Sequence, residues 1–468
     1  MNAAPRLRAG AFYADLHYAD LHMKFLDRQK ELSRLMALSR RRDGGLAVIT
    51  GRRRVGKTRL LVEWVERSGG VYFVADQSSP EVQRRYLTAA LARKLRGLDG
   101  VTFADWRTLL AGVAERAIES KWTGPLVLDE VPYLVLQAPE LPSVLQHFVD
   151  HEAKRARLTV AIAGSSQRMM QGLVMDASAP LFGRARELLM MGPLPPGYAR
   201  DVFGNQDLLE AWTAWGGIPR YWELAKDEKG SIQARIDRLV LDPLGPLHRE
   251  PDHILLEEVP SALEVRPILD AIGAGAHRVS EIAGRMGRPA TSLARPLDRL
   301  IEMGLATREV PFEESGSKRA LYRIADPFFR MWFRVVAPNR GPLATMNPAS
   351  RQALLAKHWP GLLGQAWEEL CRDSVPSLGD WSAASRWWRG NEAEWDVVAE
   401  SLDRTQLLVG EVKIQASQDD IDRLLHRPVP AFAGRRSVVR TLFAATTRGR
   451  LRTQDALLVR SADVFRRR

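Results

Sequence analysis

The residues that most constrain the fold of this chain are LAVITGRRRVGKTRLLVEW at positions 46–64. An apolar segment runs into the pattern G-x-x-x-x-G-K-T at Gly51–Thr58, and a Leu- and Val-rich segment with helical spacing follows it. This pattern indicates a phosphate-binding loop when a strand precedes it and a helix follows it, and both neighbours are expected here. The sequence therefore predicts a parallel α/β sheet that binds a nucleotide at the end of one strand.

The residue types of this loop suit a phosphate chain. Gly51 and Gly56 let the backbone curl so that successive N–H groups face the β- and γ-phosphates of ATP. Lys57 would neutralise phosphate charge, and the Thr58 hydroxyl would bind Mg²⁺. We expect further nucleotide contacts from the remaining loop residues and the start of the helix: Arg54, Val55 and Arg59.

A second apolar segment, PLVLDE at 125–130, ends in two acids. We expect Asp129 to hold the Mg²⁺ shell and Glu130 to act as the catalytic base that polarises the attacking water. Two carboxylates directly after a buried strand would be costly without a cation. The motif pair therefore predicts hydrolysis of the nucleotide as well as its binding.

Two further strands are expected in the same sheet. LTVAIAGSS at 158–166 ends at Ser165, which suits either a polar sensor beside the γ-phosphate or a plain strand-end turn. VYFVAD at 71–76 predicts a strand placed between the phosphate-loop strand and the acidic strand. That strand and the glutamate after Asp129 indicate the P-loop ATPases that use a catalytic glutamate, rather than kinases or GTPases.

An arginine pair follows this core. Arg184 and Arg186 lie in PLFGRARELLMMGPLP at 180–195. Either could complete a nucleotide site in its own chain or in a neighbouring subunit, and we choose Arg184 for this catalytic role. Surface ion pairing is the alternative for both.

Six segments in this order resemble the archaeal-type P-loop ATPase family, within the group that contains AAA+ and signal-transducing ATPases: FLDRQKELSRL, GRRRVGKTRLL, PLVLDEVPYL, AIAGSSQRMM, PLFGRARELL and GGIPRYWEL. The resemblance covers about residues 23–230. It implies an ATPase domain with ATP and Mg²⁺ as cofactors.

Composition restricts the class of protein. The chain has 468 residues, a formal charge of +12 and one cysteine, Cys371. A lone cysteine excludes an intramolecular disulfide framework, and no segment approaches the apolar length of a membrane helix, so we expect a cytoplasmic protein without a membrane partner. The charge favours DNA as a partner, because the segment 427–468 carries eleven arginines and only two acids.

The chain is too long for one compact core and is expected to be an α/β multidomain protein. Residues 1–22, which contain the duplication YADLHYADLH, are predicted to be a disordered extension. The other expected domains are a P-loop ATPase domain with a parallel sheet at 23–195, a helical lid or linker at 196–255, a winged helix-turn-helix at 256–330 and a C-terminal α/β domain at 331–468.

The winged helix is predicted from SEIAGRMG and LARPLDRLIEMGL, which have helix-turn-helix spacing, and from a hairpin around a Gly-containing turn. Arg295 and Arg299 lie on the second helix, and Lys318 and Arg319 lie at the wing tip. Such domains read DNA or act as spacers between protein modules. Acids near these cations, and a second helix without Asn or Gln, favour the spacer over sequence-specific reading.

The C-terminal domain carries the second candidate site. A hairpin is expected at 394–414, with Asp396 on one strand and Glu411 and Lys413 on one face of the other. Converging carboxylates stay ionised cheaply only around a cation, here Mg²⁺ or Mn²⁺. Lys413 is the candidate catalytic residue that orients a water, and a preceding helix offers Glu368 or Glu369 as a further metal ligand.

This arrangement resembles the PD-(D/E)xK nuclease superfamily, which implies a helix–strand–strand–strand–helix–strand core. The residues from about 256 onward also resemble the C-terminal half that often follows archaeal-type ATPases. We therefore expect a Mg²⁺-ATPase coupled to a DNA-directed nuclease-like domain. There are two alternatives: a regulatory or scaffold ATPase whose nuclease fold does not cut, and a nucleotide-gated transcription regulator. The chain could also bind a protein partner or form a homo-oligomer.

Overall fold

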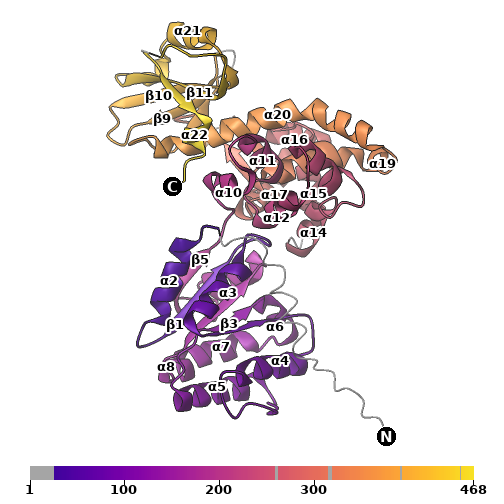
Figure 1. The fold of residues 1–468 in the computed structure, drawn as a ribbon, viewed down its shortest axis with the longest axis vertical. Helices are drawn as coiled ribbons and strands as arrows, with labels where there is room; N and C mark the ends of the chain where they lie inside the picture. Colours follow the sequence, from indigo (N-terminus) through magenta and orange to yellow (C-terminus); the bar gives the residue numbers. More distant parts are fainter. Residues whose placement is uncertain (1–25, 259–261, 315–318, 390–392, 454, 468) are drawn as a thin grey trace. The chain divides into compact units, whose positions relative to one another are not determined.

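The structure is a computed structural model that describes residues 26–258, 262–314, 319–389, 393–453 and 455–467 (Figure 1). The chain forms two compact units, Met1–Pro193 and Leu194–Arg468. The first boundary lies close to residue 195, where the sequence predicted the end of the ATPase domain. The extension expected at 1–22 lies outside the described residues.

The first unit contains a parallel sheet with the strand order β2-β3-β4-β1-β5. In the chain, β2 comes between β1 and β3, but in the sheet β2 is the edge strand and β4 takes the place between them. The spatial position expected for residues 71–76 is therefore wrong. The strands are β1 Gly45–Thr50, β2 Val71–Val74, β3 Leu126–Asp129, β4 Thr159–Gly164 and β5 Ala185–Met190.

Helices cover both faces of this sheet because alternate residues of a strand point to opposite sides. Leu46 and Val48 join a buried cluster with residues of the later helices, whereas Ala47 and Ile49 are also buried but outside that cluster. Helices α2 and α3 contact each other and the sheet. The helices are α2 Gln29–Ser39, α3 Lys57–Ser68, α4 Pro80–Ala92, α5 Trp106–Ser120, α6 Val131–Gln137, α7 Leu141–Asp150, α8 Glu152–Arg155, α9 Gln167–Met170 and the π-helix η1 Gln171–Met175.

The second unit begins with short helices that share a core with a later helical segment. Trp215 stacks on Phe328 with ring centroids 6.5 Å apart, and Tyr221 lies 4.5 Å from the same ring. The Trp332 indole donates to the His248 carbonyl at 2.7 Å. Residues expected in three separate domains therefore pack into one unit. The first helices are η2 Pro196–Ala199, α10 Arg200–Phe203, α11 Leu208–Trp215, α12 Pro219–Asp227, α13 Ile232–Ile236, η3 Asp237–Leu241 and α14 Glu250–Glu258.

Next come helices and a hairpin in the order expected of a winged helix. The hairpin strands pair antiparallel, from Ala306 opposite Ile324 to Glu309 opposite Leu321. The elements are α15 Ala262–Gly273, α16 Val279–Met286, η4 Ala290–Leu293, α17 Ala294–Glu302, β6 Ala306–Glu309 and β7 Leu321–Ile324. The wing tip at 315–318, including Lys318, lies outside the described residues.

A helical segment then leads to the C-terminal sheet. The predicted hairpin at 394–414 is confirmed as the antiparallel pair β9–β10, with Val409 opposite Val398. The sheet order is β12-β11-β10-β9-β8, and β10, β11 and β12 run parallel. The elements are α18 Pro327–Met331, η5 Trp332–Val336, η6 Ala337–Asn339, α19 Arg340–Leu343, α20 Pro348–Ser374, η7 Val375–Ser377, β8 Ser385–Trp387, β9 Trp395–Glu400, β10 Gln406–Ala416, α21 Gln418–His426, η8 Ala431–Ala433, β11 Ser437–Thr447, β12 Leu457–Arg460 and α22 Ser461–Val464.

From α20 to β11 the order is helix, three strands, helix, strand, as the nuclease resemblance implied. The assignment to that superfamily stays a prediction. Among the residues that the structure describes, no helix combines the length and apolarity required to cross a membrane.

Candidate functional sites: a nucleotide loop and a C-terminal acidic hairpin

The loop between β1 and α3 has the backbone that the glycine pattern predicts. Gly51 adopts φ 148° and Gly56 adopts φ 96°. A Cβ on Gly51 would lie 2.3 Å from the Met191 backbone oxygen, so a side chain cannot enter there without a backbone shift. The Lys57 ammonium donates to the carbonyl oxygens of Gly51 at 2.7 Å and Arg52 at 3.2 Å. Lys57 therefore lies within the curl of the loop.

The structure brings the two predicted Mg²⁺ ligands together. The Thr58 hydroxyl donates to Asp129 Oδ2 at 3.0 Å. Asp129 is fully buried at the end of β3, and its other oxygen accepts the Glu130 backbone N–H at 2.9 Å. A hydroxyl and a carboxylate are oxygen donors of the kind that Mg²⁺ prefers, so these residues fit the ion.

Tyr72 is a member of this site that the sequence did not reveal. It lies on the edge strand β2, and its hydroxyl donates to Asp129 Oδ2 at 2.8 Å. Burial raises the pKa of Tyr72 above its ordinary value, and the Asp129 carboxylate raises it further. Tyr72 is therefore a permanent hydrogen-bond donor that fixes the acid. Only the sheet register, with Tyr72 beside Val127, could have indicated this contact.

Glu130, the expected catalytic base, contacts the residue expected as a sensor. Its backbone adopts φ 53°, an uncommon value for a residue with a side chain. One carboxylate oxygen accepts the Ser165 hydroxyl at 2.9 Å and the Ser165 backbone N–H at 3.2 Å. Ser165 thus does more than end a strand, because it orients Glu130. Its role toward a γ-phosphate stays a prediction.

The other predicted nucleotide contacts divide into loop and helix residues. Arg54 adopts φ 68° within the loop, and Val55 is buried there. Arg59 lies one residue beyond the loop and is 3.9 Å from Glu63 on the same helix. Their contacts with ATP stay predictions.

Arg184 is tied to its own unit. Its Nε donates to both oxygens of Asp150, at 2.9 and 3.0 Å, and its Nη1 donates to the Pro180 carbonyl. This ion pair matches the alternative reading of surface pairing. A catalytic role for Arg184 toward a neighbouring subunit stays a prediction.

Arg28 is a second residue that the sequence did not reveal. It precedes α2, is 7% exposed and adopts φ 66°. Its Nη2 donates to the carbonyl of Val55 at 3.3 Å and to that of Gly192. Arg28 therefore ties the nucleotide loop to the segment that follows β5. The motif FLDRQKEL contains it, but motif matching alone does not indicate this contact.

In the C-terminal hairpin, the expected D…E-x-K residues lie on neighbouring strands. Asp396 on β9 accepts the Val412 backbone N–H of β10 at 3.0 Å. Glu411 pairs with Lys413 at 3.3 Å and with Arg427 at 2.8 Å. The arginine that neutralises Glu411 was not foreseen as part of this site.

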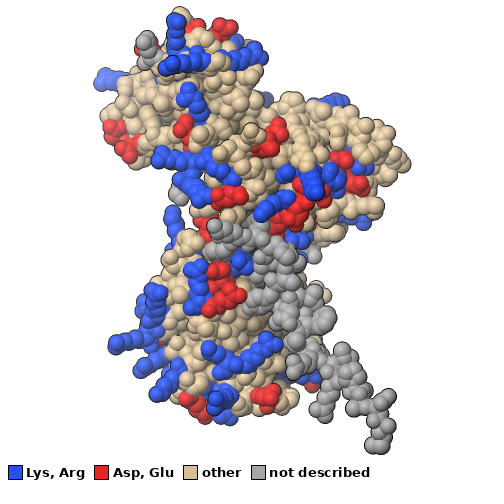
Figure 2. Space-filling model, in the orientation of Figure 1, with Lys and Arg blue, Asp and Glu red and all other residues tan. Residues whose placement is uncertain are grey.

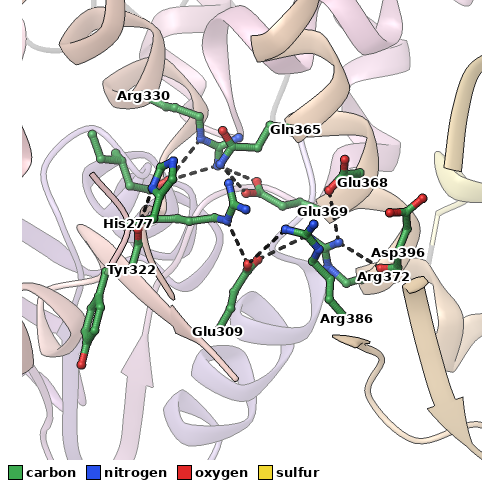
Figure 3. Close-up of polar contacts among 12 residues, drawn as sticks. His277, Glu309, Tyr322, Arg330, Gln365, Glu368, Glu369, Arg372, Arg386 and Asp396 are labelled. Carbon is green, nitrogen blue, oxygen red and sulfur yellow. Dashed lines mark hydrogen bonds and ion pairs between the residues drawn. The ribbon is translucent and has the colours of Figure 1, made fainter. Parts of the chain in front are cut away.

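The two candidate glutamates of α20 face different partners (Figure 3). Glu369 pairs with Arg330 at 2.5 Å, and Gln365 donates to its other oxygen. Glu368 lies 3.6 Å from Arg372, which also donates to the Asp396 carbonyl at 3.1 Å. The sequence left open whether Glu368 or Glu369 is the candidate metal ligand on α20. The structure favours Glu368, because Glu368 and not Glu369 lies on the side of Asp396.

Two carboxyl groups of this site have raised pKa values, mainly because they are buried. Burial raises the pKa of Glu368, with a further increase from Asp396, against the effect of Arg386. Burial also raises the pKa of Asp396, and Glu411 adds to it, against the Val412 hydrogen bond and nearby cations.

The fit of these residues to a metal ion is partial. Within the described parts of the chain, no group of three or more His, Cys, Asp or Glu side chains could hold a metal. Mg²⁺ is often bound by one or two carboxylates with water and phosphate, so Asp396 and Glu411 stay candidates. Of the two alternatives for the helix ligand, Glu369 is engaged by Arg330, and Glu368 stays the candidate.

The expected DNA-facing cations are only partly available. Arg295 is exposed on α17, but Arg299 lies 3.6 Å from Glu264, and Arg319 pairs with Glu314 at 2.6 Å. The start of the predicted wing contacts β8, because the Phe312 N–H donates to the Arg386 carbonyl at 2.8 Å.

Some arginines of the C-terminal segment 427–468 also bind groups of the protein itself. Arg436 lies 2.8 Å from both Glu313 and Glu400, and Arg440 donates to the Arg427 carbonyl. On the face shown in Figure 2, basic side chains are interspersed with acidic ones. A single basic surface for nucleic acid is not apparent on that face.

Comparison with known proteins places these sites in families. Residues 25–224 match a family described as an ATPase domain predominantly from Archaea, in agreement with the resemblance predicted over 23–230. Residues 332–424 match a family described as "Archaea bacterial proteins of unknown function". An uncharacterized protein of Methanocaldococcus jannaschii is 27% identical over 419 residues, 86% of this chain and 90% of that protein.

One solved structure shows a related fold, and a second is similar at a lower TM-score. A Walker-type ATPase of Pyrococcus abyssi is 19% identical, with a TM-score of 0.51, over 66% of this chain and 96% of that chain. The ORC2 protein of Aeropyrum pernix, in ADPNP and ADP complexes, is 14% identical with a TM-score of 0.42, over 73% and 94% of the two chains. By these matches, residues 25–224 are similar to the predominantly archaeal ATPase domain, and residues 332–424 are similar to the family of unknown function.

Proposed function

We propose that this chain is a Mg²⁺-dependent ATPase whose nucleotide state controls a DNA-directed C-terminal module. The observation that carries the proposal is the connected set at the ends of β1, β3 and β4. Lys57 lies in the phosphate loop, Thr58 contacts Asp129, and Ser165 orients Glu130. This set contains the phosphate-binding lysine, the Mg²⁺ ligands and the glutamate base that the P-loop class with a catalytic glutamate uses for ATP hydrolysis.

Each side chain has a definable task. Lys57 and the loop N–H groups neutralise and position the β- and γ-phosphates. Thr58 and Asp129 would hold Mg²⁺, which supplies further charge neutralisation on the phosphates when bound. Glu130 accepts a proton from the attacking water, and Ser165 keeps its carboxylate in one orientation. Tyr72 restrains Asp129 through a hydrogen bond to the same carboxylate oxygen that Thr58 contacts.

The ATPase proposal is tested by hydrolysis and binding assays on the full chain. Lys57→Ala should lose nucleotide binding and hydrolysis, because the phosphate charge is no longer neutralised. Glu130→Gln should still bind ATP but hydrolyse it roughly 100-fold or more slowly, the usual effect of losing a general base. Glu66→Gln, at an exposed position of α3, is the matched control. Wild-type turnover in Glu130→Gln would refute the assignment of the base.

For the C-terminal module, the nuclease-like reading is supported by Asp396, Glu411 and Lys413 on adjacent strands. A module that binds DNA or protein without cutting is favoured by a different observation, the pairing of Glu411 with Arg427 as well as Lys413. Only the nuclease-like proposal requires a metal on the hairpin.

A plasmid degradation assay with Mg²⁺ or Mn²⁺ separates them. If the module cuts, Asp396→Ala and Lys413→Ala should abolish degradation, while Asp419→Ala and Lys357→Ala, at exposed positions, should not change it. If wild type and Asp396→Ala degrade the plasmid to the same extent, the nuclease proposal fails and the non-cutting module is supported. Sequence-specific protection in a footprint would instead support a transcription regulator.

A further inference from the structure

A cavity of about 370 Å³ lies within the second unit, bounded by the winged-helix elements and by α20 and β8. Its lining includes four arginines and one histidine, but a single carboxylate: Arg323, Arg330, Arg334, Arg386, His277 and Glu368. The volume is in the usual range for small-molecule sites. Apart from Glu368, a candidate metal ligand of the nuclease-like site, the residues that line this cavity have no role in the ATPase or nuclease-like proposals.

Three of the four lining arginines contact carboxylates, Glu309 and Glu369 among them (Figure 3). Glu309 pairs with Arg323 at 2.8 Å and lies 3.9 Å from Arg386, and it also contacts Arg372 at 3.3 Å. One carboxylate thus serves three guanidinium groups. Arg386 also lies 3.3 Å from Glu394, so among the described residues Arg334 is the lining arginine without an ion pair.

Two of the lining arginines retain unused hydrogen-bond donors. Arg330 is 6% exposed, and its Nη1 has no acceptor in the described part of the chain, although Glu369 and the Ile324 carbonyl engage its Nη2. Arg334 is exposed and makes no ion pair with any described residue. Leaving a buried guanidinium N–H without an acceptor is costly, so the cluster favours an additional anionic partner.

The wall formed by α20 points to the same conclusion. Gly361 and Gly364 line the cavity in the middle of this 27-residue helix. A Cβ built on either residue meets no atom within 4 Å. Glycine within a helix costs about 1 kcal/mol relative to alanine, and no packing constraint of the protein itself accounts for it here. The two glycines keep the cavity open.

We infer that this cavity binds a phosphomonoester dianion, with the phosphate on the arginine cluster. Guanidinium forks match phosphate oxygens in pairs, and the surplus of arginine suits a doubly charged group. The volume exceeds that of free phosphate, and Ile272 and Leu362 supply apolar wall for the remainder of a phosphorylated small molecule. Because α15, β7, α20 and β8 all contribute, the ligand would join the winged-helix elements to the C-terminal sheet.

The test is calorimetric titration of the full chain with inorganic phosphate and, separately, with AMP. The Lys57→Ala background removes the phosphate contact of the ATP loop, so binding there does not depend on the proposed ATPase. Saturable binding is expected. Tighter binding of AMP would identify a phosphorylated small molecule as the ligand, and equal affinities would identify the phosphate group alone.

Two variants assign the binding to the cavity. Gly364→Leu fills it and Arg334→Ala removes an unpaired guanidinium, and each should weaken binding at least about tenfold. Gly284→Leu is the matched control, because a Cβ at Gly284 in α16 also meets no atom within 4 Å. Arg435→Ala, at an exposed position, is the control for charge. The inference is overturned if neither ligand binds, or if Gly364→Leu binds as tightly as Gly284→Leu.

Discussion

Replacing Glu309 by glutamine tests whether the arginine cluster depends on one carboxylate. Glu309 ends β6 with its side chain 19% exposed, and it pairs with Arg323 at 2.8 Å and Arg372 at 3.3 Å. Glutamine keeps the shape of the side chain but removes the charge. The guanidinium groups are then left buried without their shared anion.

The size of the effect follows from the remaining partners. Removing one member of a buried ion pair costs roughly 3–5 kcal/mol of unfolding free energy. Arg372 keeps Glu368 at 3.6 Å and Arg386 keeps Glu394 at 3.3 Å, whereas Arg323 has no other ion pair among the described residues. We therefore expect the lower end, about 3 kcal/mol, and a decrease in Tm of roughly 5–10 °C for a unit of this size.

The effect should depend on pH with a defined sign. Burial alone raises the pKa of Glu309, but Arg323 and Arg372 outweigh it and lower the pKa below the ordinary 4.5. The stabilisation is therefore fully present above pH 4.5 and is lost as the pH falls through the lower folded-state value. The difference between wild type and Glu309→Gln should be constant near neutral pH and shrink in acid.

The assay is urea unfolding of the full chain, followed by tryptophan fluorescence from pH 7 down to about pH 3, across the ordinary carboxyl pKa range. Glu302→Gln, on the exposed side of α17, is the control and should unfold like wild type. A Glu309→Gln protein within about 0.5 kcal/mol of wild type, the usual range of surface changes, would refute the reasoning. So would a loss of stability that does not change with pH.

Three changes test the nucleotide site. A Cβ at Gly51 would lie 2.3 Å from the Met191 backbone oxygen, so Gly51→Ala should weaken ATP binding by at least about 100-fold in a fluorescence titration, and unchanged affinity would contradict the loop geometry. Arg28→Ala frees the loop from the segment after β5 and should raise KM for ATP about tenfold, with kcat within about twofold; a fall in kcat alone would argue against a positioning role. Ser165→Ala removes the hydroxyl that orients Glu130 and should lower kcat about tenfold with little effect on ATP affinity, whereas an increase in kcat would mean that Ser165 restrains the base.

The local parts of both sites were predictable because they depend on short motifs. The strand–loop–helix around Gly51–Thr58, the acids after β3 and the β9–β10 hairpin all follow from residues close in sequence. Turn glycines, strand alternation and the position of an acid at a strand end are local properties of the chain. These features therefore appear in the structure where the sequence placed them.

Contacts between distant segments could not be predicted in the same way. The exchange of β2 and β4 in the sheet changes no local pattern, yet it places Ser165 beside Glu130 and leaves Tyr72 at the edge, within reach of Asp129. The partner of Glu369 likewise depends on how α18 packs on α20. No sequence pattern distinguished Glu368 from its neighbour.

The sequence by itself determined that this chain carries a phosphate-loop motif after one strand of a parallel sheet and an acidic hairpin at 394–414. Both motifs depend on residues that are close together in the chain. Only the tertiary structure decided how charges from separate elements combine. Arg323, Arg330 and Arg386 come from β7, α18 and β8, and all three line the basic cavity. Electrostatic energy depends on distance in space and on burial, and neither quantity is written in the order of the residues.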